Sequence, residues 1–501
     1  MSIRQMSTRL FLTCWVIYGL HFATDFVREH FLVVSIAEQG TFRLDEYHGL
    51  HPDIFQLPDG HAHHGANPGI SMIAAIPYFL LRPVTDRIVR RELAARGEDT
   101  NTTASYQDQR PARVRFYKEV RRRGLDVKFG LVGFITMMLC MAPLTALSVV
   151  AMFRVLGGTG LSNRIALGGA FLYAFGTPVF LRTAYLNQNL AVGVFGFLAF
   201  ALLWDPGRRS RLSKRVRYTL SGLLAGLALL CDYSGGMMLA LCGVYAVARG
   251  RDDASWAEAI RTSTWYALGA IGPILVLWFY QWSAFGSPFY PPQHHMPPVE
   301  WSDLGYQGVT GPNQDLFWVL LLDPRFGLFI TAPMLLLALF APWLNAKKMS
   351  IVPWRETAFV LAVAVAFVIF FSGVQYTQIQ YITGIRYLVP IIPFLFLLTV
   401  VVLVRLPRVV TYFIAFIAIA MNWAFAMARP HTLDTSILGS IKRVLLEGFQ
   451  LPALSTLSKM APQYVPNVGV VSPLPLLMFA AVVIFLIWRI ETPTTGLGSD
   501  G

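Results

Sequence analysis

The sequence predicts an all-α polytopic membrane protein with about twelve transmembrane helices. Of its 501 residues, 55% are hydrophobic and 14% are charged, whereas a soluble domain has about 25% charged residues. Apolar runs near the length of about 20 residues that spans a bilayer recur along the chain. Lys and Arg gather in short loops between alternate pairs of these runs, as the positive-inside rule expects.

Twelve apolar segments are the expected spans, and a large loop at residues 25–127 follows the first of them. We expect residues 1–429 to form one transmembrane module that includes this loop, and residues 430–501 to add an external loop and a final span. The expected spans are 9–24, 128–154, 163–181, 188–204, 218–233, 235–249, 263–283, 327–344, 355–372, 386–404, 409–427 and 473–489.

Three basic loops set the expected orientation of the spans. Asp205–Arg217, Asn345–Lys348 and Val404–Arg408 are rich in Lys or Arg and should face the cytoplasm. The intervening loops should therefore face outward, and so should both ends of the loop at 25–127. That loop contains the apolar piece Pro68–Leu81, which is then not a single crossing. Because this piece is short and contains proline, we expect an interfacial or re-entrant helix.

Residues 82–128 do not fit this orientation locally. They hold thirteen Lys and Arg against seven Asp and Glu, which by itself suggests the cytoplasm. Orientation follows the sum over short loops, however, so one basic external insert can be overruled. On the external side, such an insert could contact anionic lipid.

The segment Thr24–Leu81 is the strongest functional signal in the chain. It follows the first span directly and carries acids, arginine and a histidine cluster. Charge at a helix–membrane boundary is costly to bury, so it marks a candidate functional site. In contrast, the middles of the spans are almost free of charge, which is unlike a transporter with charged residues at the bilayer midplane.

Short motifs follow one another along the chain in a fixed order. They are Gly40-Thr41-Phe42 with Asp45, Asp59-Gly60-His61, Pro68-Gly69, Phe175–Pro178, Gly222–Gly236, Phe285–Phe289, Leu320–Leu337 and Gly384–Phe394. In this order they resemble the GT-C superfamily of membrane glycosyltransferases, especially bacterial relatives of protein O-mannosyltransferases and aminoarabinose transferases. Two departures stand out: His63–Gly69 has no lysine before Pro68-Gly69, and Gln188-Asn189 stands where the family often has histidine.

This resemblance implies an integral membrane glycosyltransferase of GT-C fold. It would transfer a sugar, with inversion, from a polyprenyl-phosphate donor to a glycan, lipid or protein acceptor. The implied location is the bacterial inner (cytoplasmic) membrane, with the active site on the external, periplasmic face. No cofactor is expected. The alternatives are a transporter or flippase for lipid-linked sugars, or a polymerase or ligase that uses pyrophosphate-linked donors.

A lipid phosphate is a good leaving group, so the protein must deprotonate the acceptor and stabilise the departing phosphate. Asp25, at the outer end of the first span, is the candidate general base, with Asp45 as the second candidate. Alternatively, Asp25 caps the next helix. Arg386 is the main candidate for the phosphate, with Arg182 and Arg28, because Arg binds phosphate in a bidentate manner. The alternative for Arg386 is a snorkelling interface anchor, and for Arg28 an ordinary loop ion pair.

Six further residues are candidates for substrate binding. His61, His63 and His64 could hold sugar hydroxyls by hydrogen bonds, and their spacing lacks the i, i+4 pattern of helical zinc sites, so no metal is assigned. Asn189, Asp232 and Tyr233 stand at the outer ends of spans, although Tyr233 could equally belong to an aromatic belt. The net charge of +13 lies mainly in loops beside the spans, so the expected partner is membrane lipid rather than nucleic acid.

Overall fold

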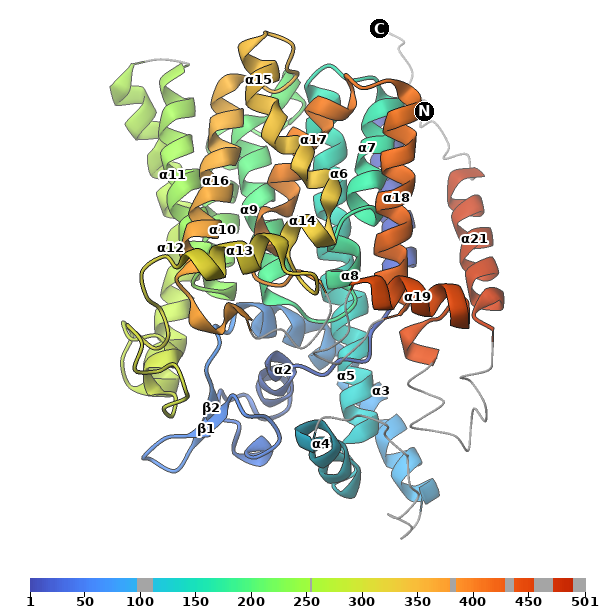
Figure 1. Cartoon of the computed structure of the whole chain (residues 1–501). Coiled ribbons are helices and arrows are strands. Elements are labelled where there is room, and N and C mark those ends of the chain that lie inside the picture. The colour runs from blue at the N-terminus through green and yellow to red at the C-terminus, as the bar shows by residue number, and fades with distance from the viewer. Residues whose placement is uncertain (97–110, 253–254, 379–383, 429–436, 455–471, 490–501) are drawn as a thin grey trace, which may run out of the picture.

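The computed structural model describes residues 1–96, 111–252, 255–378, 384–428, 437–454 and 472–489. Long helices form a bundle, and short helices with one β-hairpin gather at one end of it (Figure 1). We call this end, at the bottom of Figure 1, the loop end. The N-terminus lies at the opposite end.

The first helix, α1 (Ile3–Leu20), runs from the opposite end to the loop end. The expected loop 25–127 follows it, and its described residues lie at the loop end, where α5 also starts, so this loop begins and ends on one side as predicted. Its elements are α2 (Arg28–Gln39), η1 (Asp45–Tyr47), β1 (Ile54–Gln56), β2 (Ala62–His64), α3 (Gly69–Arg96) and α4 (Pro111–Arg122). The two strands pair antiparallel, with Phe55 opposite His63.

The remaining helices build the bundle and its links. The continuous ones are α7 (Asn163–Phe175), α9 (Gln188–Trp204), α10 (Lys214–Cys231), α11 (Gly235–Asp252), α12 (Trp256–Phe285), α16 (Trp354–Ser372), α17 (Ile392–Leu403), α18 (Arg408–Met427) and α21 (Leu474–Arg489). One further helix is α5 (Asp126–Thr136) joined to α6 (Ala142–Gly158) through a π-helical turn, η2 (Met137–Met141). The short helices are α8 (Val179–Thr183), η3 (Pro206–Arg208), η4 (Pro292–His295), α13 (Gln314–Leu322), η6 (Gln375–Gln378), η7 (Val389–Ile391) and α19 (Ile437–Glu447).

Local sequence explains where many bundle helices begin. Ser162, Asn187, Ser213, Ser255 and Asn313 are N-caps, and the side chain of each accepts a backbone N–H from the first turn. Such a bond satisfies a helix donor that otherwise has no partner. The caps start α7, α9 and α10 within four residues of the expected spans, whereas α12 begins seven residues earlier than expected and α13 corresponds to no expected span.

Within the described residues, four helical stretches are long and apolar enough to cross a membrane by themselves, and four shorter apolar helices accompany them. The long stretches are Asp126–Gly158, Trp256–Phe285, Trp354–Ser372 and Arg408–Met427. The shorter ones are Gln188–Trp204, Pro333–Ala346, Val389–Leu403 and Leu474–Arg489. Each overlaps a predicted span.

The structure corrects two predicted helices. The expected span 327–344 is broken into α14 (Leu328–Thr331), the 3-10 helix η5 (Pro333–Phe340) and α15 (Ala341–Ala346). Proline interrupts a continuous helix because it lacks a backbone N–H, and two prolines stand at the starts of these pieces. The expected short helix at Pro68–Leu81 instead continues as α3 to Arg96, with Pro77 and Pro83 inside it.

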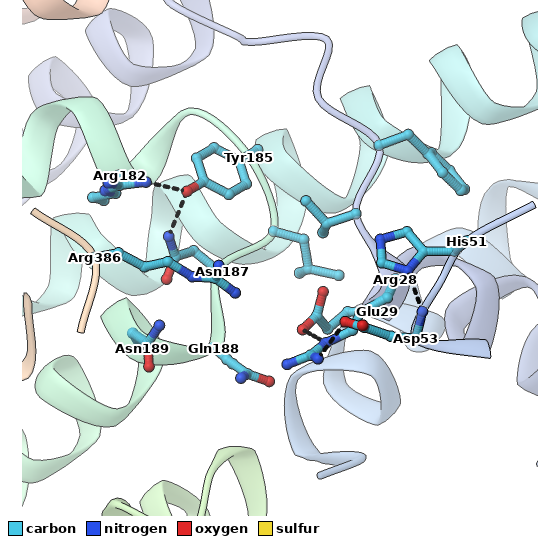
Figure 2. A pocket seen from close by; sticks show the side chains of 13 residues that line it. Arg28, Glu29, His51, Asp53, Arg182, Tyr185, Asn187, Gln188, Asn189 and Arg386 are labelled. Carbon is cyan, nitrogen blue, oxygen red and sulfur yellow. Dashed lines mark hydrogen bonds and ion pairs between the residues drawn. The ribbon is translucent and has the colours of Figure 1, made fainter. Parts of the chain in front are cut away.

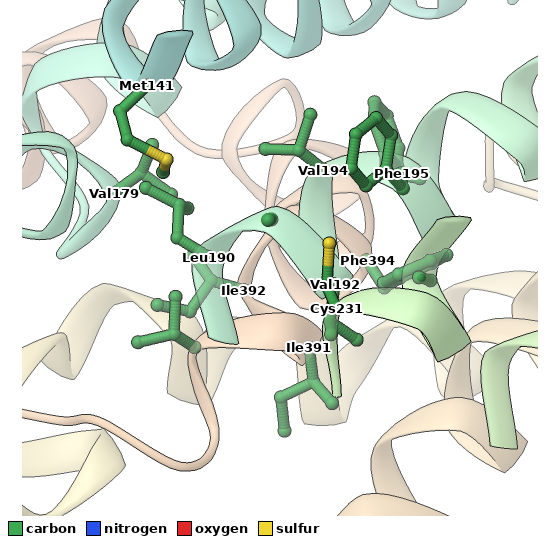
Figure 3. Close-up of a cluster of buried hydrophobic side chains, with 14 of the residues drawn as sticks. Met141, Val179, Leu190, Val192, Val194, Phe195, Cys231, Ile391, Ile392 and Phe394 are labelled. Carbon is green, nitrogen blue, oxygen red and sulfur yellow. The ribbon is translucent and has the colours of Figure 1, made fainter. Parts of the chain in front are cut away.

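The core of the bundle is apolar, and glycine permits its closest helix contact. Figure 3 shows part of this core, a single cluster of buried side chains to which Leu190 and Val194 of α9, Phe394 of α17 and Cys231 of α10 all belong. A Cβ at Gly222 of α10 would lie 1.8 Å from the Tyr266 carbonyl oxygen of α12. Only glycine allows α10 and α12 to approach this closely.

Candidate active site

A pocket of about 130 Å³ opens at the loop end between segments that are far apart in the sequence. The link from α1 to α2, the link from α8 to α9, and the turn before η7 all contribute to it. Figure 2 shows Arg28, Glu29 and Asp53 on one side, and Arg182 and Arg386 across the pocket. The three arginines predicted for the phosphate therefore line one pocket.

The acidic side of the pocket is organised by Arg28. Its Nη1 donates to Asp53 Oδ2 over 2.6 Å, and its Nε donates to Glu29 Oε1 over 3.1 Å. His51 holds the backbone beside Asp53 in place, because its Nδ1 accepts the backbone N–H of Asp53 over 3.1 Å. Arg28 thus forms the loop ion pairs that were one alternative for it, and it also lines the pocket.

Arg28 determines the protonation of both carboxyl groups. Burial alone would raise the pKa of Glu29 and of Asp53, but the Arg28 guanidinium outweighs burial, and the pKa of each carboxyl is lowered. Both groups are therefore ionised carboxylates at neutral pH. They stand ready to accept hydrogen bonds from a ligand.

Arg182 is fully buried on the opposite side, and its guanidinium donates to two backbone carbonyl groups and to one hydroxyl. Its Nη2 donates to the Gly384 carbonyl oxygen and its Nε to the Ile385 carbonyl oxygen, each over 2.6 Å. Its Nη1 donates to the Tyr185 hydroxyl over 2.6 Å. Gly384 has φ +88°, a left-handed conformation that favours glycine. Arg182 therefore holds the turn that ends at Arg386.

Arg386 presents a guanidinium to the pocket from this turn. Its side chain is half-buried and lies 5.0 Å from the Tyr387 ring centroid. No ion pair involves Arg386 in the part of the chain that the structure describes. A guanidinium that lines a pocket and makes no ion pair with the carboxylates of the described residues is suited to an anionic ligand. Its place in the pocket argues against the alternative of an interface anchor.

Polar side chains of α9 and its cap line the rest of the pocket. The Asn187 amide donates to the Tyr185 hydroxyl over 3.0 Å, and Asn189 lines the wall nearby (Figure 2). The Gln188 amide donates to Asp232 Oδ2 over 3.0 Å. Asp232 is therefore joined to the pocket through Gln188 and does not itself line it.

Asp25 lies beside the pocket, in the link between α1 and α2. It is buried and directly precedes Phe26–Glu29, the part of the link that lines the pocket. The N-cap of α2 is Val27, whose backbone N–H is bound by His30 Nδ1. Val27 rather than Asp25 is thus the N-cap residue of this helix, and capping through the Asp25 carboxylate stays a prediction.

The other predicted site residues lie outside the pocket lining. Asp45 supports the β-hairpin, because it accepts the Ala62 N–H over 2.6 Å and contacts His61 Nδ1 at 2.9 Å. His63 is buried with its ring 5.3 Å from that of Phe285, and Tyr233 bonds to Gln281 of α12. Burial and the charge of Arg28 lower the pKa of the buried His64 to about 3, so its ring is neutral at pH 7.

Sequence reasoning missed the pocket roles of Glu29, His51, Asp53, Tyr185 and Asn187. Asp53 and His51 lie in a polar loop, where such residues are common and usually solvated. Tyr185 and Asn187 stand beside Arg182, so a signal was present in the polar run Arg182–Asn189 within an apolar stretch.

Of three comparisons with known proteins, only the one with solved structures gives a match, and that match agrees with this fold. No protein-family model matches the sequence, and a search of curated proteins gives no match. The structure is similar to the crystal structure of ArnT from Cupriavidus metallidurans bound to undecaprenyl phosphate, with a TM-score of 0.50 and 14% sequence identity. The match covers 96% of this chain and 75% of that one. This likeness shows the fold, so the predicted all-α polytopic membrane fold is confirmed as an ArnT-like one.

Proposed function

We propose that this chain is a membrane glycosyltransferase that moves a sugar from a polyprenyl-phosphate donor to an acceptor at the loop end of the bundle. The reaction inverts the anomeric carbon and takes place on the external face of a bacterial inner membrane. The observation that carries the proposal is Arg386, a half-buried guanidinium in a pocket beside Arg28 and Arg182. That the ArnT structure holds undecaprenyl phosphate supports the same class of donor.

We assign the donor phosphate to Arg386, with Arg28 at the facing wall. A guanidinium offers two parallel N–H groups to phosphate oxygens, which suits the charge that grows on phosphate as the sugar leaves. Arg182 acts on the phosphate site indirectly, because its hydrogen bonds hold the carbonyl groups of the turn before Arg386. Arg182 is in this proposal a positioning residue.

Asp25 is our proposed general base for the acceptor hydroxyl. It is buried directly before the lining segment Phe26–Glu29. Glu29 and Asp53 line the pocket, but Arg28 lowers the pKa of each, and a lower pKa makes a carboxylate a weaker base. We therefore propose that Glu29 and Asp53 pair with Arg28 and accept hydrogen bonds from sugar hydroxyls. Asn189, and Asp232 through Gln188, would bind further hydroxyls of the donor sugar.

Release of free polyprenyl phosphate tests the proposal directly. Purified protein in detergent is incubated with a panel of polyprenyl-phosphate sugars and a crude envelope fraction that supplies acceptors. Wild type should release polyprenyl phosphate from one donor, whereas Asp25→Asn should fold normally and release none. Asp303→Asn, an exposed acid in the loop after α12, is the matched control and should release as wild type does.

Two results would count against the proposal. Full activity of Asp25→Asn would remove Asp25 as the base but keep the enzyme class. Release from none of the polyprenyl-phosphate donors by folded protein would remove the donor class, and activity with a pyrophosphate-linked donor would then identify a polymerase or ligase.

A further inference from the structure

Helix α3 is fixed to the loop by one face. Ile70, Ala74 and Tyr78 on this face are buried, and the Tyr78 hydroxyl donates to Glu38 Oε1 of α2 over 2.6 Å. Arg82 Nη1 donates to the Glu38 carbonyl oxygen over 3.3 Å. These contacts set which face of α3 points away from the protein.

The opposite face of α3 is apolar in its first half. Ile76, Phe79, Leu80 and Val84 are exposed, with Leu80 at 70%. Successive residues of an α-helix turn by about 100°, so the positions 76, 79, 80, 83, 87 and 90 share one side of the helix. A continuous row of large exposed apolar side chains on one side marks a contact surface for an apolar partner.

The same side is cationic in its second half. Arg87 and Arg90 are exposed there, and the Arg90 Nε donates to the Asp86 carbonyl oxygen over 3.3 Å. The Asp86 carboxylate faces Arg82, with Oδ2 3.4 Å from Arg82 Nε. Among the described residues, no ion pair involves Arg87 or Arg90. Their charges are therefore available to an external anion.

A groove of about 630 Å³ joins the two halves. Phe79, Leu80 and Pro83 line its apolar part, and Arg82, Arg87 and Arg90 line its cationic part, together with Asp86. Neither this groove nor the arginines in it belong to the pocket between Arg28 and Arg386. The groove is thus a separate site.

Along α3 the apolar half comes first and the cationic half second, which matches the order of acyl chains and phosphate from the middle of a lipid leaflet to its surface. The end of α3 points away from the bundle (Figure 1), so Arg87 and Arg90 lie farther from the spans than Phe79 and Leu80. With a rise of 1.5 Å per residue, Leu80 and Arg87 are separated by about 10 Å along the helix. A phospholipid that lies along α3 would meet apolar side chains with its acyl chains and arginines with its phosphate.

We propose that the groove on α3 binds an anionic phospholipid of the surrounding membrane. The acyl chains contact Ile76, Phe79 and Leu80, and the phosphate binds Arg87 and Arg90. Charge complementarity and the apolar-to-cationic order favour a lipid over a soluble protein partner. The inference needs the membrane fold but does not depend on the proposed transferase activity.

Photocrosslinking at Phe79 tests the proposal. p-Benzoylphenylalanine replaces the exposed Phe79 in the full chain, which is reconstituted into nanodiscs of phosphatidylcholine with a minor share of phosphatidylglycerol of the same acyl chains. Mass spectrometry gives the share of phosphatidylglycerol among the lipid adducts. Each basic residue near a membrane surface is worth about fivefold in binding of anionic lipid. We therefore expect phosphatidylglycerol to be enriched about fivefold or more over its bulk share.

Charge variants decide whether the two arginines cause the enrichment. Arg87→Gln with Arg90→Gln should return the adducts to the bulk share, and Arg87→Lys with Arg90→Lys should keep most of the enrichment. Arg164→Gln with Arg211→Gln makes the same change of charge at exposed sites at the opposite end and should leave the enrichment unchanged. Adducts at the bulk share in wild type, or enrichment that survives the Gln pair, would overturn the proposal.

Discussion

Arg182 and Gly384 are joined by a hydrogen bond of 2.6 Å, from Arg182 Nη2 to the Gly384 carbonyl oxygen, although 202 residues separate them. A second bond of 2.6 Å runs from Arg182 Nε to the Ile385 carbonyl oxygen. The planar guanidinium thus holds two successive carbonyl groups of the turn before Arg386. The position of Arg386 in the pocket therefore depends on Arg182, whose two bonds to this turn are made to neutral carbonyl groups.

Arg182→Lys should therefore cost both stability and ligand binding. Lysine keeps the charge but cannot present the fixed fork of donors that reaches two adjacent carbonyls. Each buried carbonyl that loses its donor costs about 1–3 kcal/mol, so loss of the donors to both carbonyl groups should destabilise the protein by about 2–6 kcal/mol. Thermal unfolding in detergent measures the loss, and binding of polyprenyl phosphate should weaken with it. Arg405→Lys, at an exposed arginine whose Nε donates to the Met349 carbonyl oxygen over 2.9 Å, is the control and should change little.

Arg386→Gln should separate ligand binding from stability. The side chain is half-buried, and in the described part of the chain it makes no ion pair, so its loss should leave the melting temperature nearly unchanged. A hydrogen bond to a charged group is worth about 1.5–3 kcal/mol, which predicts polyprenyl phosphate binding at least about tenfold weaker. Titration calorimetry in detergent measures this affinity. Wild-type affinity in Arg386→Gln would remove Arg386 from the phosphate site.

The sequence was informative wherever a charge stood beside an apolar run. Arg28, Arg182 and Arg386 were each selected for this reason, and the structure brings them to one pocket. Asp53 and His51 were not selected for this pocket, because a polar loop gives no contrast by which to distinguish a pocket residue from a solvated one. That Arg182 binds carbonyl groups could not be predicted, since its partners are 202 and 203 residues away in sequence.

The errors in helix boundaries have a different physical origin. Hydropathy predicted one span at 327–344, although Pro333 and Pro342 signal that the helix is interrupted. Conversely, the expected helix ended at Leu81 because the apolar run ends there. The structure instead continues α3 to Arg96, since Tyr78, Thr85 and Val89 keep a buried face at helical spacing.

Arg28→Met should reverse the pH dependence that Glu29 and Asp53 give to stability. In wild type the pKa of each carboxyl is lowered, so its contribution is present above the unfolded pKa, about 4–4.5, and is lost as pH falls through the folded pKa. Without Arg28, burial dominates and raises both pKa values. The contribution is then present below the unfolded pKa and lost as pH rises through the raised folded pKa.

Melting temperatures between pH 3 and pH 8 in detergent check this reversal, because the wild-type loss begins below about pH 4.5. Wild type should be less stable at the acid end, whereas Arg28→Met should gain stability there relative to neutral pH. Arg217→Met, which breaks an ion pair with Asp205 at the opposite end, controls for the general effect of losing an arginine. Parallel pH profiles for wild type and Arg28→Met would contradict the assigned role of Arg28.

Gly193→Ala should disturb the pocket from inside the bundle. A Cβ at Gly193 of α9 would lie 2.7 Å from Pro390 Cα of η7, so backbone has to move, and η7 begins three residues after Arg386. Overpacking of this kind costs about 1–3 kcal/mol, and a shift of η7 should weaken polyprenyl phosphate binding as well. Gly168→Ala in α7 meets nothing within 4 Å and should be neutral or stabilise by up to about 1 kcal/mol, because alanine favours helix. Thermal unfolding and calorimetry of both variants compare these outcomes. Equal stability and equal affinity in the two would show that contact between α9 and η7 does not position Arg386.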